Sequence, residues 1–329
     1  MTFVVVGNDA GGSELLCAFI KENFTQASWH IFAQDSSPMQ TIAQRESLHV
    51  NPIKNIKNQL ENLPFDALLF ATGWQEKPER EFVEFAKNHN IASFAFLDHW
   101  SNYRERFGFP EKNWKKNLPD FTVTHDKKSL QLAKELALPS PIAVENFYLK
   151  KIVQDTKVQK KLSTLLFLGE PTDKVAKAHY NDENYWGFTQ YTALEMICDN
   201  FEKFECASLS IRLHPSEKSS AYKKILKKYP HIKSRINEAS VFELSAQIMQ
   251  AKMIIGFDTM ALYIAAHLNK ALVSFLPSQK REFLLPLPKS HQISKLSQLK
   301  KFHLQPLHLK EENFGIDFAL FKQLIKEFK

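Results

Sequence analysis

Short apolar runs alternate with amphipathic stretches along most of the chain. The runs show little polar alternation, which is typical of parallel strands buried on both faces, and the stretches between them carry apolar residues at helical spacing. The repeated order of strand and helix predicts an α/β fold built on parallel sheets. In the first half we expect strands over 3–6, 29–33, 66–71, 91–97 and 120–124, and helices over 13–24, 39–45, 79–88 and 127–136.

A charged stretch rich in lysine and glutamine, 150–161, interrupts this alternation. We place a domain boundary there, with one Rossmann-like domain over 1–150 and a second over 151–329, since the length suits about two domains. In the second domain we expect strands over 163–168, 207–213 and 252–256, a last strand over 271–275, and helices over 189–204, 219–228, 241–250 and 260–268.

The chain ends in an amphipathic stretch, 317–329. Its apolar residues lie along one face of a helix, and its lysines lie opposite. We expect this face to pack back across the first domain; the alternative is contact with a membrane surface. The apolar residues are Phe318, Phe321, Leu324, Ile325 and Phe328.

Composition narrows the class of protein. A net charge of +7 favours acidic partners such as nucleotides or anionic headgroups, but no nucleic-acid-binding signature is present and we expect no nucleic acid partner. The three cysteines lack Cys-x-x-Cys spacing, so we expect neither disulfides nor a zinc site. No apolar run approaches the ~20 residues that span a bilayer, and no signal segment is recognisable. We expect a cytoplasmic protein.

The strand expected over 207–213 runs directly into His214 and Pro215. Pro215 has no N–H group to donate, so it ends the strand pairing and leaves His214 at a carboxyl end of the sheet. An imidazole that can carry a proton, with Arg212 nearby, suits a phosphate or diphosphate group. The alternative is an ordinary turn after a strand.

A second polar turn follows the strand expected over 252–256. Asp258 and Thr259 stand where a helix-capping residue belongs, directly before the apolar-periodic run 260–268. That helix would aim free N–H groups and a positive dipole end at the same edge of the sheet. We therefore expect this helix end and His214 to bind one phosphate group.

A glycine-rich turn, Gly7-Asn-Asp-Ala-Gly-Gly12, follows the first strand. Its spacing is neither the dinucleotide pattern G-x-G-x-x-G nor a Walker loop with its lysine. Asp9 or Ser13 is expected to cap the following helix.

The strand over 91–97 ends in a chemically dense stretch, 98–107. Asp98 lies where open α/β sheets place ligands and is the leading candidate for a general base. We expect Trp100 and Tyr103 to stack on a sugar ring, and Arg104 or Arg106 to pair with an anionic group.

An alternative interpretation of 98–107 is purely structural. Asp98 would then cap a helix, Trp100 and Phe107 would lie in the core, and Glu105 would pair with a neighbouring arginine.

Three stretches resemble known enzymes. Arg-Leu-His-Pro-Ser-Glu at 212–217 is similar to the His-Pro element of bacterial sialyltransferases and of capsule or lipopolysaccharide transferases. Residues 255–275 resemble a pattern common in those enzymes and in UDP-N-acetylglucosamine 2-epimerases, and 97–107 looks like a block from bacterial surface-polysaccharide clusters. With two α/β halves of similar size, the chain resembles the GT-B glycosyltransferases, which implies two doubly wound Rossmann-like domains facing a cleft.

The resemblance also implies site residues. His214 would contact the donor phosphate with Thr259 behind it, the first domain would hold the acceptor, and Asp98 or Asp9 would be the base. The implied donor-site residues are Gly169, Glu170, Arg212, His214, Pro215, Glu217, Gly256, Asp258 and Thr259; the implied acceptor-site residues are Gly11, Gly12, His99, Trp100, Tyr103 and Arg106.

The chain departs from the pattern at two positions. Asp258 stands where these enzymes have Ser or Gly, and Ala271 where they have Pro. Asp258 would put a negative charge near the phosphate unless it faces away as a cap or binds a ribose hydroxyl.

The expected function is transfer of a sugar from a nucleotide donor to a hydroxyl of a bacterial surface glycan, with a CMP-nonulosonate favoured as donor and a UDP-sugar next. Protonated His214 and the helix end at Thr259 would stabilise the leaving phosphate, and the carboxylate base would activate the hydroxyl. The chain has no Asp-x-Asp pair, and we expect no metal or other cofactor.

Two further functions stay open. One is a UDP-sugar 2-epimerase-like or NAD-dependent sugar enzyme, because Asp35 is placed ~20 residues beyond the glycine turn like the ribose-binding acid of a Rossmann domain. The other is a scaffold subunit without catalysis.

Overall fold

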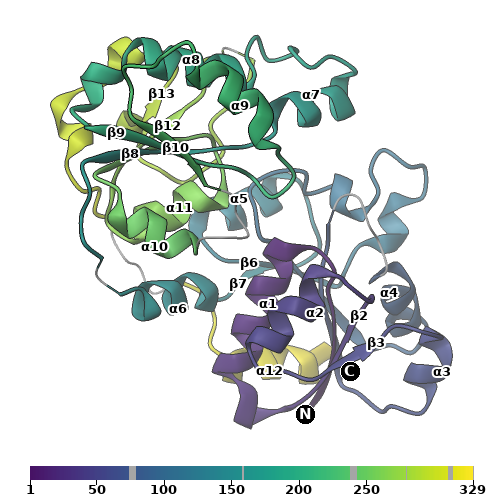
Figure 1. The fold of residues 1–329 in the computed structure, drawn as a ribbon. Helices are drawn as coiled ribbons and strands as arrows, with labels where there is room; N and C mark the ends of the chain where they lie inside the picture. Colours follow the sequence, from purple (N-terminus) through teal and green to yellow (C-terminus); the bar gives the residue numbers. More distant parts are fainter. Residues whose placement is uncertain (74–78, 158, 238–242, 279, 310–313, 329) are drawn as a thin grey trace. The chain divides into compact units, whose positions relative to one another are not determined.

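The chain forms two compact units (Figure 1). The computed structural model describes residues 1–73, 79–157, 159–237, 243–278, 280–309 and 314–328. Unit 1 comprises Met1–Lys151 together with Glu312–Lys329, and unit 2 comprises Ile152–Glu311. The C-terminal helix therefore belongs to unit 1, whereas the sequence analysis included it in the second domain.

Unit 1 is built on a seven-stranded parallel sheet in the order β3-β2-β1-β4-β5-β6-β7. Its two outermost strands were not predicted from the sequence. Both are short and include a proline, which has no N–H group to donate to a neighbouring strand. The strands are β1 (Thr2–Val6), β2 (Ser28–Ala33), β3 (Val50–Pro52), β4 (Ala67–Ala71), β5 (Ala92–Phe96), β6 (Phe121–Thr124) and β7 (Pro141–Ala143).

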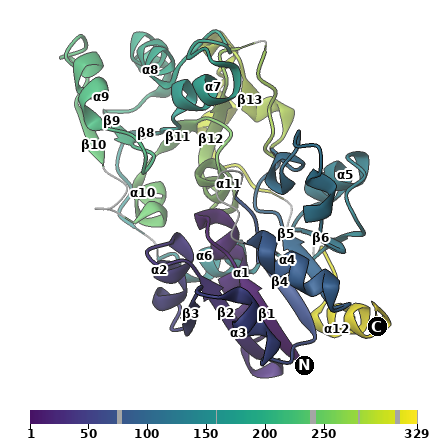
Figure 2. The same ribbon diagram turned by 90° about the vertical axis from the view of Figure 1, so that its right-hand side faces the viewer.

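Helices cover both faces of this sheet (Figure 2). Alternate side chains of β1 point to opposite faces: Phe3 and Val5 pack with α1, α2 and α12, while Val4 and Val6 pack with α3, α4 and α5. These helices are α1 (Ala10–Glu22), α2 (Pro38–Arg45), α3 (Ile56–Glu61), α4 (Glu79–Asn88), α5 (Lys127–Glu135) and α12 (Phe318–Phe328). Short 3₁₀ helices span Phe24–Gln26, Glu105–Phe107 and Trp114–Asn117, and α6 (Phe147–Asp155) contains the division between the units.

The C-terminal helix α12 completes the core of unit 1. The rings of Phe321 and Phe94 are 4.6 Å apart, and Phe318 and Ile325 lie in the same cluster. The expectation that this helix packs on the first domain is confirmed, and Phe318, Phe321 and Ile325 of its apolar face are buried against protein. Among the helices of the described residues, none has the length and apolar character needed to cross a membrane.

Unit 2 has a six-stranded parallel sheet in the order β10-β9-β8-β11-β12-β13. The expectation that 271–275 is the last strand was wrong, because the two residues of β13 follow it; β10 was also not predicted. The strands are β8 (Thr164–Leu168), β9 (Ser208–Arg212), β10 (Ser234–Asn237), β11 (Met253–Gly256), β12 (Ala271–Phe275) and β13 (Gln292–Ile293).

Of the helices of unit 2, the one over Thr172–Tyr180 was not predicted, and the one predicted over 189–204 ends earlier, at Asp199. The helices are α7 (Thr172–Tyr180), α8 (Gln190–Asp199), α9 (Ser219–Leu226), α10 (Leu244–Gln250) and α11 (Met260–His267), with 3₁₀ helices over Phe201–Phe204, Lys289–His291, Leu296–Gln298 and Lys301–Leu304. The predicted start of α10 at 241 lies outside the described residues.

Both sheets reverse their strand order beside the first strand of the unit, between β1 and β4 and between β8 and β11. In open α/β sheets, ligands bind outside the carboxyl ends of the strands at such a switch point. The loops after these four strands are therefore the places to look for a site. The doubly wound architecture expected from the sequence is confirmed.

Candidate functional site

The loop after β9 presents His214 at the carboxyl edge of the sheet of unit 2. The N–H of His214 donates to Glu217 Oε2 over 2.9 Å, and the hydroxyl of Tyr222 donates to Glu217 Oε1 over 2.6 Å. Glu217 therefore braces the loop that carries His214. The donor contact expected of Glu217 remains a prediction.

Gly169, which follows β8, packs against the carboxylate of Glu217. A Cβ at this position would lie 2.7 Å from Glu217 Oε2 and 3.0 Å from the carbonyl oxygen of Arg212. Its N–H donates to that carbonyl over 2.8 Å. Glycine is needed here for close packing of the two loops.

His214 is set up as a neutral hydrogen-bond donor. The backbone N–H of Ser216 donates to Nδ1 over 3.2 Å, which leaves the ring proton on Nε2. Partial desolvation lowers the pKa of His214. The negative charge of Glu170 opposes this shift, and the positive charge of Lys174 adds to it. The cation expected from the sequence is therefore not the resting form at neutral pH.

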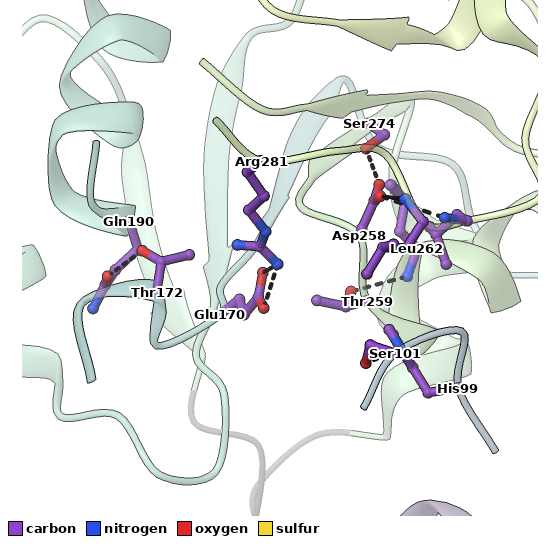
Figure 3. A network of polar contacts seen from close by, with 12 residues as sticks. His99, Ser101, Glu170, Thr172, Gln190, Asp258, Thr259, Leu262, Ser274 and Arg281 are labelled. Atoms are coloured by element: carbon purple, nitrogen blue, oxygen red, sulfur yellow. Dashed lines mark hydrogen bonds and ion pairs between the residues drawn. The ribbon is translucent and has the colours of Figure 1, made fainter. Parts of the chain in front are cut away.

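The turn after β11 separates the roles of Asp258 and Thr259 (Figure 3). Thr259 is the N-cap of α11, and its hydroxyl accepts from the N–H of Leu262. The buried carboxylate of Asp258 accepts from the hydroxyl of Ser274 and from the N–H groups of Leu284 and Leu285. Asp258 therefore points into the protein, and its charge is directed away from the end of α11.

The first turn of α11 keeps backbone donors available. Within the described residues, the N–H groups of Met260 and Ala261 make no hydrogen bond to another backbone or side-chain group. Gly256, at the end of β11, lies against β8, where a Cβ would come 2.9 Å from Leu168 Cβ. The helix end thus has the free donors and the dipole that favour a phosphate oxygen, whereas Gly256 has a packing role.

Glu170 is held by a residue that the sequence analysis missed. Arg281 donates to both carboxylate oxygens over 2.7 and 2.9 Å (Figure 3). Its guanidinium lies 4.8 Å from the centroid of the Trp186 ring. In the sequence, the basic pair Lys280-Arg281 shortly after β12 could have indicated a partner for this carboxylate. Arg212 is half-buried, and burial lowers its pKa.

In unit 1, Asp98 is an ion-paired carboxylate. Arg106 Nη1 lies 2.6 Å from Asp98 Oδ1 and donates to the carbonyl oxygen of Thr72 over 2.7 Å. Burial, the largest single cause, would raise the pKa of Asp98, but the charge and hydrogen bond of Arg106 together with the nearby His99 outweigh it, so the pKa is lowered. Asp98 is therefore a weaker proton acceptor than the sequence suggested.

Asp9 has the opposite shift. Its carboxylate caps α1 by accepting from the N–H of Gly12 over 3.0 Å. Burial and the negative charge of Asp98 raise the pKa of Asp9. Two carboxyl groups with pKa values displaced in opposite directions can divide the roles of acid and base between them.

The glycines of the first turn make this arrangement possible. A Cβ at Gly11 would lie 1.8 Å from Asp98 Oδ2, and one at Gly12 would lie 2.4 Å from Ala71 Cβ. Both positions therefore serve packing around Asp98 and β4. The ligand contacts expected of Gly11 and Gly12 remain a prediction.

The structure places the aromatic residues of 98–107 in the core. Trp100, Tyr103 and Phe107 are buried, and Trp100 Nε1 donates to Asp126 Oδ2 over 2.9 Å. Their rings are enclosed by protein, which is against the expected stacking on a sugar. Arg106 is likewise committed to Asp98, while His99 is partly exposed and contacts Ser101 Oγ at 3.0 Å.

A neighbouring histidine gives unit 1 an expected acid sensitivity. Burial lowers the pKa of His125 from 6.5 to about 4, so the folded unit keeps the ring neutral where the unfolded chain takes up a proton. Stability is then lost as the pH falls from about 6.5 to about 4, by up to ~1.4 kcal/mol per pH unit. Urea unfolding across this range should show a smaller loss for His125→Gln than for the wild type, with exposed His49→Gln as control. Equal losses in His125→Gln and the wild type would contradict this.

This chain resembles known proteins in its fold and not in its sequence. No family model and no curated protein matches the sequence. The solved UDP-GlcNAc 2-epimerase of Methanocaldococcus jannaschii is similar with a TM-score of 0.63 and 14% identity, covering 99% of this chain and 100% of that chain. The UDP-GlcNAc 2-epimerase of Neisseria meningitidis, solved bound to UDP-GlcNAc, has a TM-score of 0.61 and 13% identity over 85% and 84% of the two chains.

MurG of Acinetobacter baumannii is similar with a TM-score of 0.50 and 12% identity, over 99% of this chain and 92% of that chain. Identities this low carry the fold alone. The two Rossmann-like units therefore define a GT-B fold.

Proposed function

We propose that this chain is a UDP-sugar-dependent enzyme, and that it inverts C2 of the sugar as a 2-epimerase-like enzyme. The observation that carries the proposal is the phosphate-suited edge of unit 2. Neutral His214 offers Nε2–H, α11 offers free N–H groups, and Asp258 turns its charge away. Hydrogen-bond donors at a helix N-terminus are a common phosphate site, and here they stand at a switch point.

The choice of a UDP-sugar replaces the CMP-nonulosonate that the sequence favoured. The comparisons with solved structures include a UDP-GlcNAc 2-epimerase bound to UDP-GlcNAc and another protein of similar fold solved with UDP, and they give no support to CMP-linked transfer. Inversion at C2 by proton transfer breaks one C–H bond and forms another on the opposite face of the sugar, which an acid and a base on opposite faces can accomplish. The oppositely shifted pKa values of Asp9 and Asp98 suit that division.

Nucleotide binding provides the first test. UDP at about a hundred times its Kd should stabilise the wild type by roughly 2.7 kcal/mol and raise its melting transition. CMP and NAD should have little effect, and His214→Ala should lose most of the response to UDP. His231→Ala, an exposed histidine of unit 2, is the matched control.

The pH dependence of UDP binding tests the role of His214 further. Because a bound phosphate favours imidazolium, UDP affinity should rise as the pH falls from neutral toward the lowered pKa of His214, and this rise should be absent in His214→Ala. A response to NAD alone would instead favour the dinucleotide alternative with Asp35. An unchanged response to UDP in His214→Ala would remove His214 from the site.

The reaction itself is tested with UDP-GlcNAc in D₂O, followed by proton NMR. An epimerase exchanges the C2 proton for deuterium and forms the C2 epimer without any acceptor. Asp9→Asn and Asp98→Asn should each slow this exchange by at least ~10²-fold if the two carboxyl groups act as acid and base. UDP binding without exchange in the wild type would reject epimerisation and leave nucleotide-sugar binding intact.

Glycosyl transfer from a UDP-sugar is the second candidate. It is supported by the His-Pro element at 212–217 and by the likeness to MurG, a GT-B glycosyltransferase. A transferase would release UDP in the presence of an acceptor hydroxyl and leave the C2 proton in place.

A further inference from the structure

Unit 2 has a cavity at the edge of its sheet opposite to His214 and Thr259. The cavity has a volume of about 440 Å³ and lies where β8, β11 and β12 begin. This volume is within the range of roughly 300–1,000 Å³ that is usual for small-molecule sites. Neither the glycine turns nor the His-Pro loop contributes to its lining.

The lining combines an apolar floor with three lysines. Leu162 and Leu304 are among the apolar residues, and Lys161, Lys252 and Lys270 supply the charge. Among the described residues that line the cavity there is no carboxylate. The cavity therefore has a positive charge that its own walls do not balance.

Lys270 is the central cation. Its side chain is only 7% exposed, and its Nζ donates to the carbonyl oxygen of Met249 over 3.0 Å, near the end of α10. Burial and the nearby charge of Lys161 lower the pKa of Lys270 to about 8. A buried ammonium next to another cation and without an opposing carboxylate is the expected origin of such a shift.

A structural role for Lys270 accounts for only part of this arrangement. A lysine that donates to a helix C-terminal carbonyl is a common cap, but an ammonium has three N–H donors and this bond uses one of them. Lys252 is engaged differently, since its Nζ lies 2.5 Å from the carbonyl oxygen of Glu205 and 4.0 Å from its carboxylate. The cap does not explain why Lys161 lines the same apolar cavity.

We propose that this cavity binds a small organic anion that has an apolar body, such as a medium-chain carboxylate. The carboxylate would contact Lys270 and Lys161, and the hydrocarbon would cover the leucine floor. Charge-assisted hydrogen bonds to a partly buried ammonium are stronger than neutral ones, and the apolar body gains from leaving water. The site is separate from the proposed UDP site and does not depend on it.

Calorimetry with three probes tests the proposal. Octanoate should bind saturably at a ratio of one per chain, whereas octanol lacks the charge and inorganic phosphate lacks the apolar body. Both should bind at least tenfold more weakly than octanoate. Equal binding of octanol and octanoate, or no saturable octanoate binding at millimolar concentration, would overturn the proposal.

Substitutions locate the site. Lys270→Met should weaken octanoate binding at least tenfold; because Lys270 is buried, Lys161→Met at the exposed rim serves as a second variant that preserves the fold. Lys224→Met on α9 is the matched control, and His214→Ala should bind octanoate like the wild type. Octanoate affinity unchanged in both Lys270→Met and Lys161→Met would place the anion elsewhere and reject the assignment.

Discussion

Replacing Arg106 by methionine is expected to lower the free energy of unfolding of unit 1 by about 3–5 kcal/mol. Arg106 is 8% exposed, and its guanidinium is ion-paired with the largely buried carboxylate of Asp98. Methionine fills a similar volume but leaves Asp98 charged and without its counterion. Urea unfolding, monitored by far-UV circular dichroism and intrinsic tryptophan fluorescence, measures the change.

The controls separate charge from packing. Lys57→Met removes the ion pair with Glu61, but the Lys57 side chain is 77% exposed, so the loss should stay below ~1 kcal/mol. The double variant Asp98→Leu with Arg106→Met should recover much of the stability, because no unpaired buried charge remains. If Arg106→Met costs no more than Lys57→Met, the Asp98–Arg106 pair does not have the importance that its burial implies.

Replacing Phe321 by alanine is expected to destabilise unit 1 by about 3–5 kcal/mol. The ring is fully buried on α12 and packs against Phe19 and Phe94, which belong to α1 and β5. Its removal opens a cavity where three segments far apart in the sequence meet. Thermal and urea unfolding of the full chain would measure the loss.

Phe328→Ala on the same helix is the matched control. The side chain of Phe328 is 38% exposed, so the same substitution removes less buried surface and should cost well under half as much. Similar losses for the two variants would mean that α12 contributes through helix formation and not through the core of unit 1. That result would also reopen the question of what its apolar face contacts.

The two predictions concern two contacts that stabilise the sheet of unit 1. A buried ion pair lies beside the glycine turn that leads into α1, and the C-terminal helix α12 packs against the sheet. The first arrangement holds Asp98 ionised next to Asp9, and the second stabilises the sheet that positions both. Stability and the acid–base properties of this edge are therefore connected in unit 1.

Much of the fold followed from hydrophobic pattern. Strands such as β4 and β8 are continuous apolar runs, and the helices between them carry apolar residues at helical spacing, so local sequence was sufficient. The strands that were missed, such as β7 and β13, are short and lie at or near the sheet edges. Their pairing is decided by neighbours distant in sequence, which pattern alone does not report.

Parts of the candidate site could also be predicted from the sequence. Thr259 caps α11 as a Ser/Thr before an apolar-periodic run should, and Pro215 ends β9 so that His214 follows the strand. These outcomes depend on residues within a few positions of one another. The partners of the three carboxylates could not be predicted from the sequence, because they come together only in the folded unit. The pairs are Glu217 with Tyr222, Asp258 with Ser274, and Glu170 with Arg281.

By itself, then, the sequence determined two parallel α/β sheets, the capped helix after β11 and the position of His214 at a strand end, because each depends on local geometry and side-chain periodicity. Only the tertiary structure decided that Asp98 is neutralised by Arg106, that Asp258 turns inward, and that α12 belongs to unit 1. Charge and burial depend on which groups come within a few ångströms after folding. Those distances are set by how the chain folds, even where the partners are close in sequence, as Asp98 and Arg106 are.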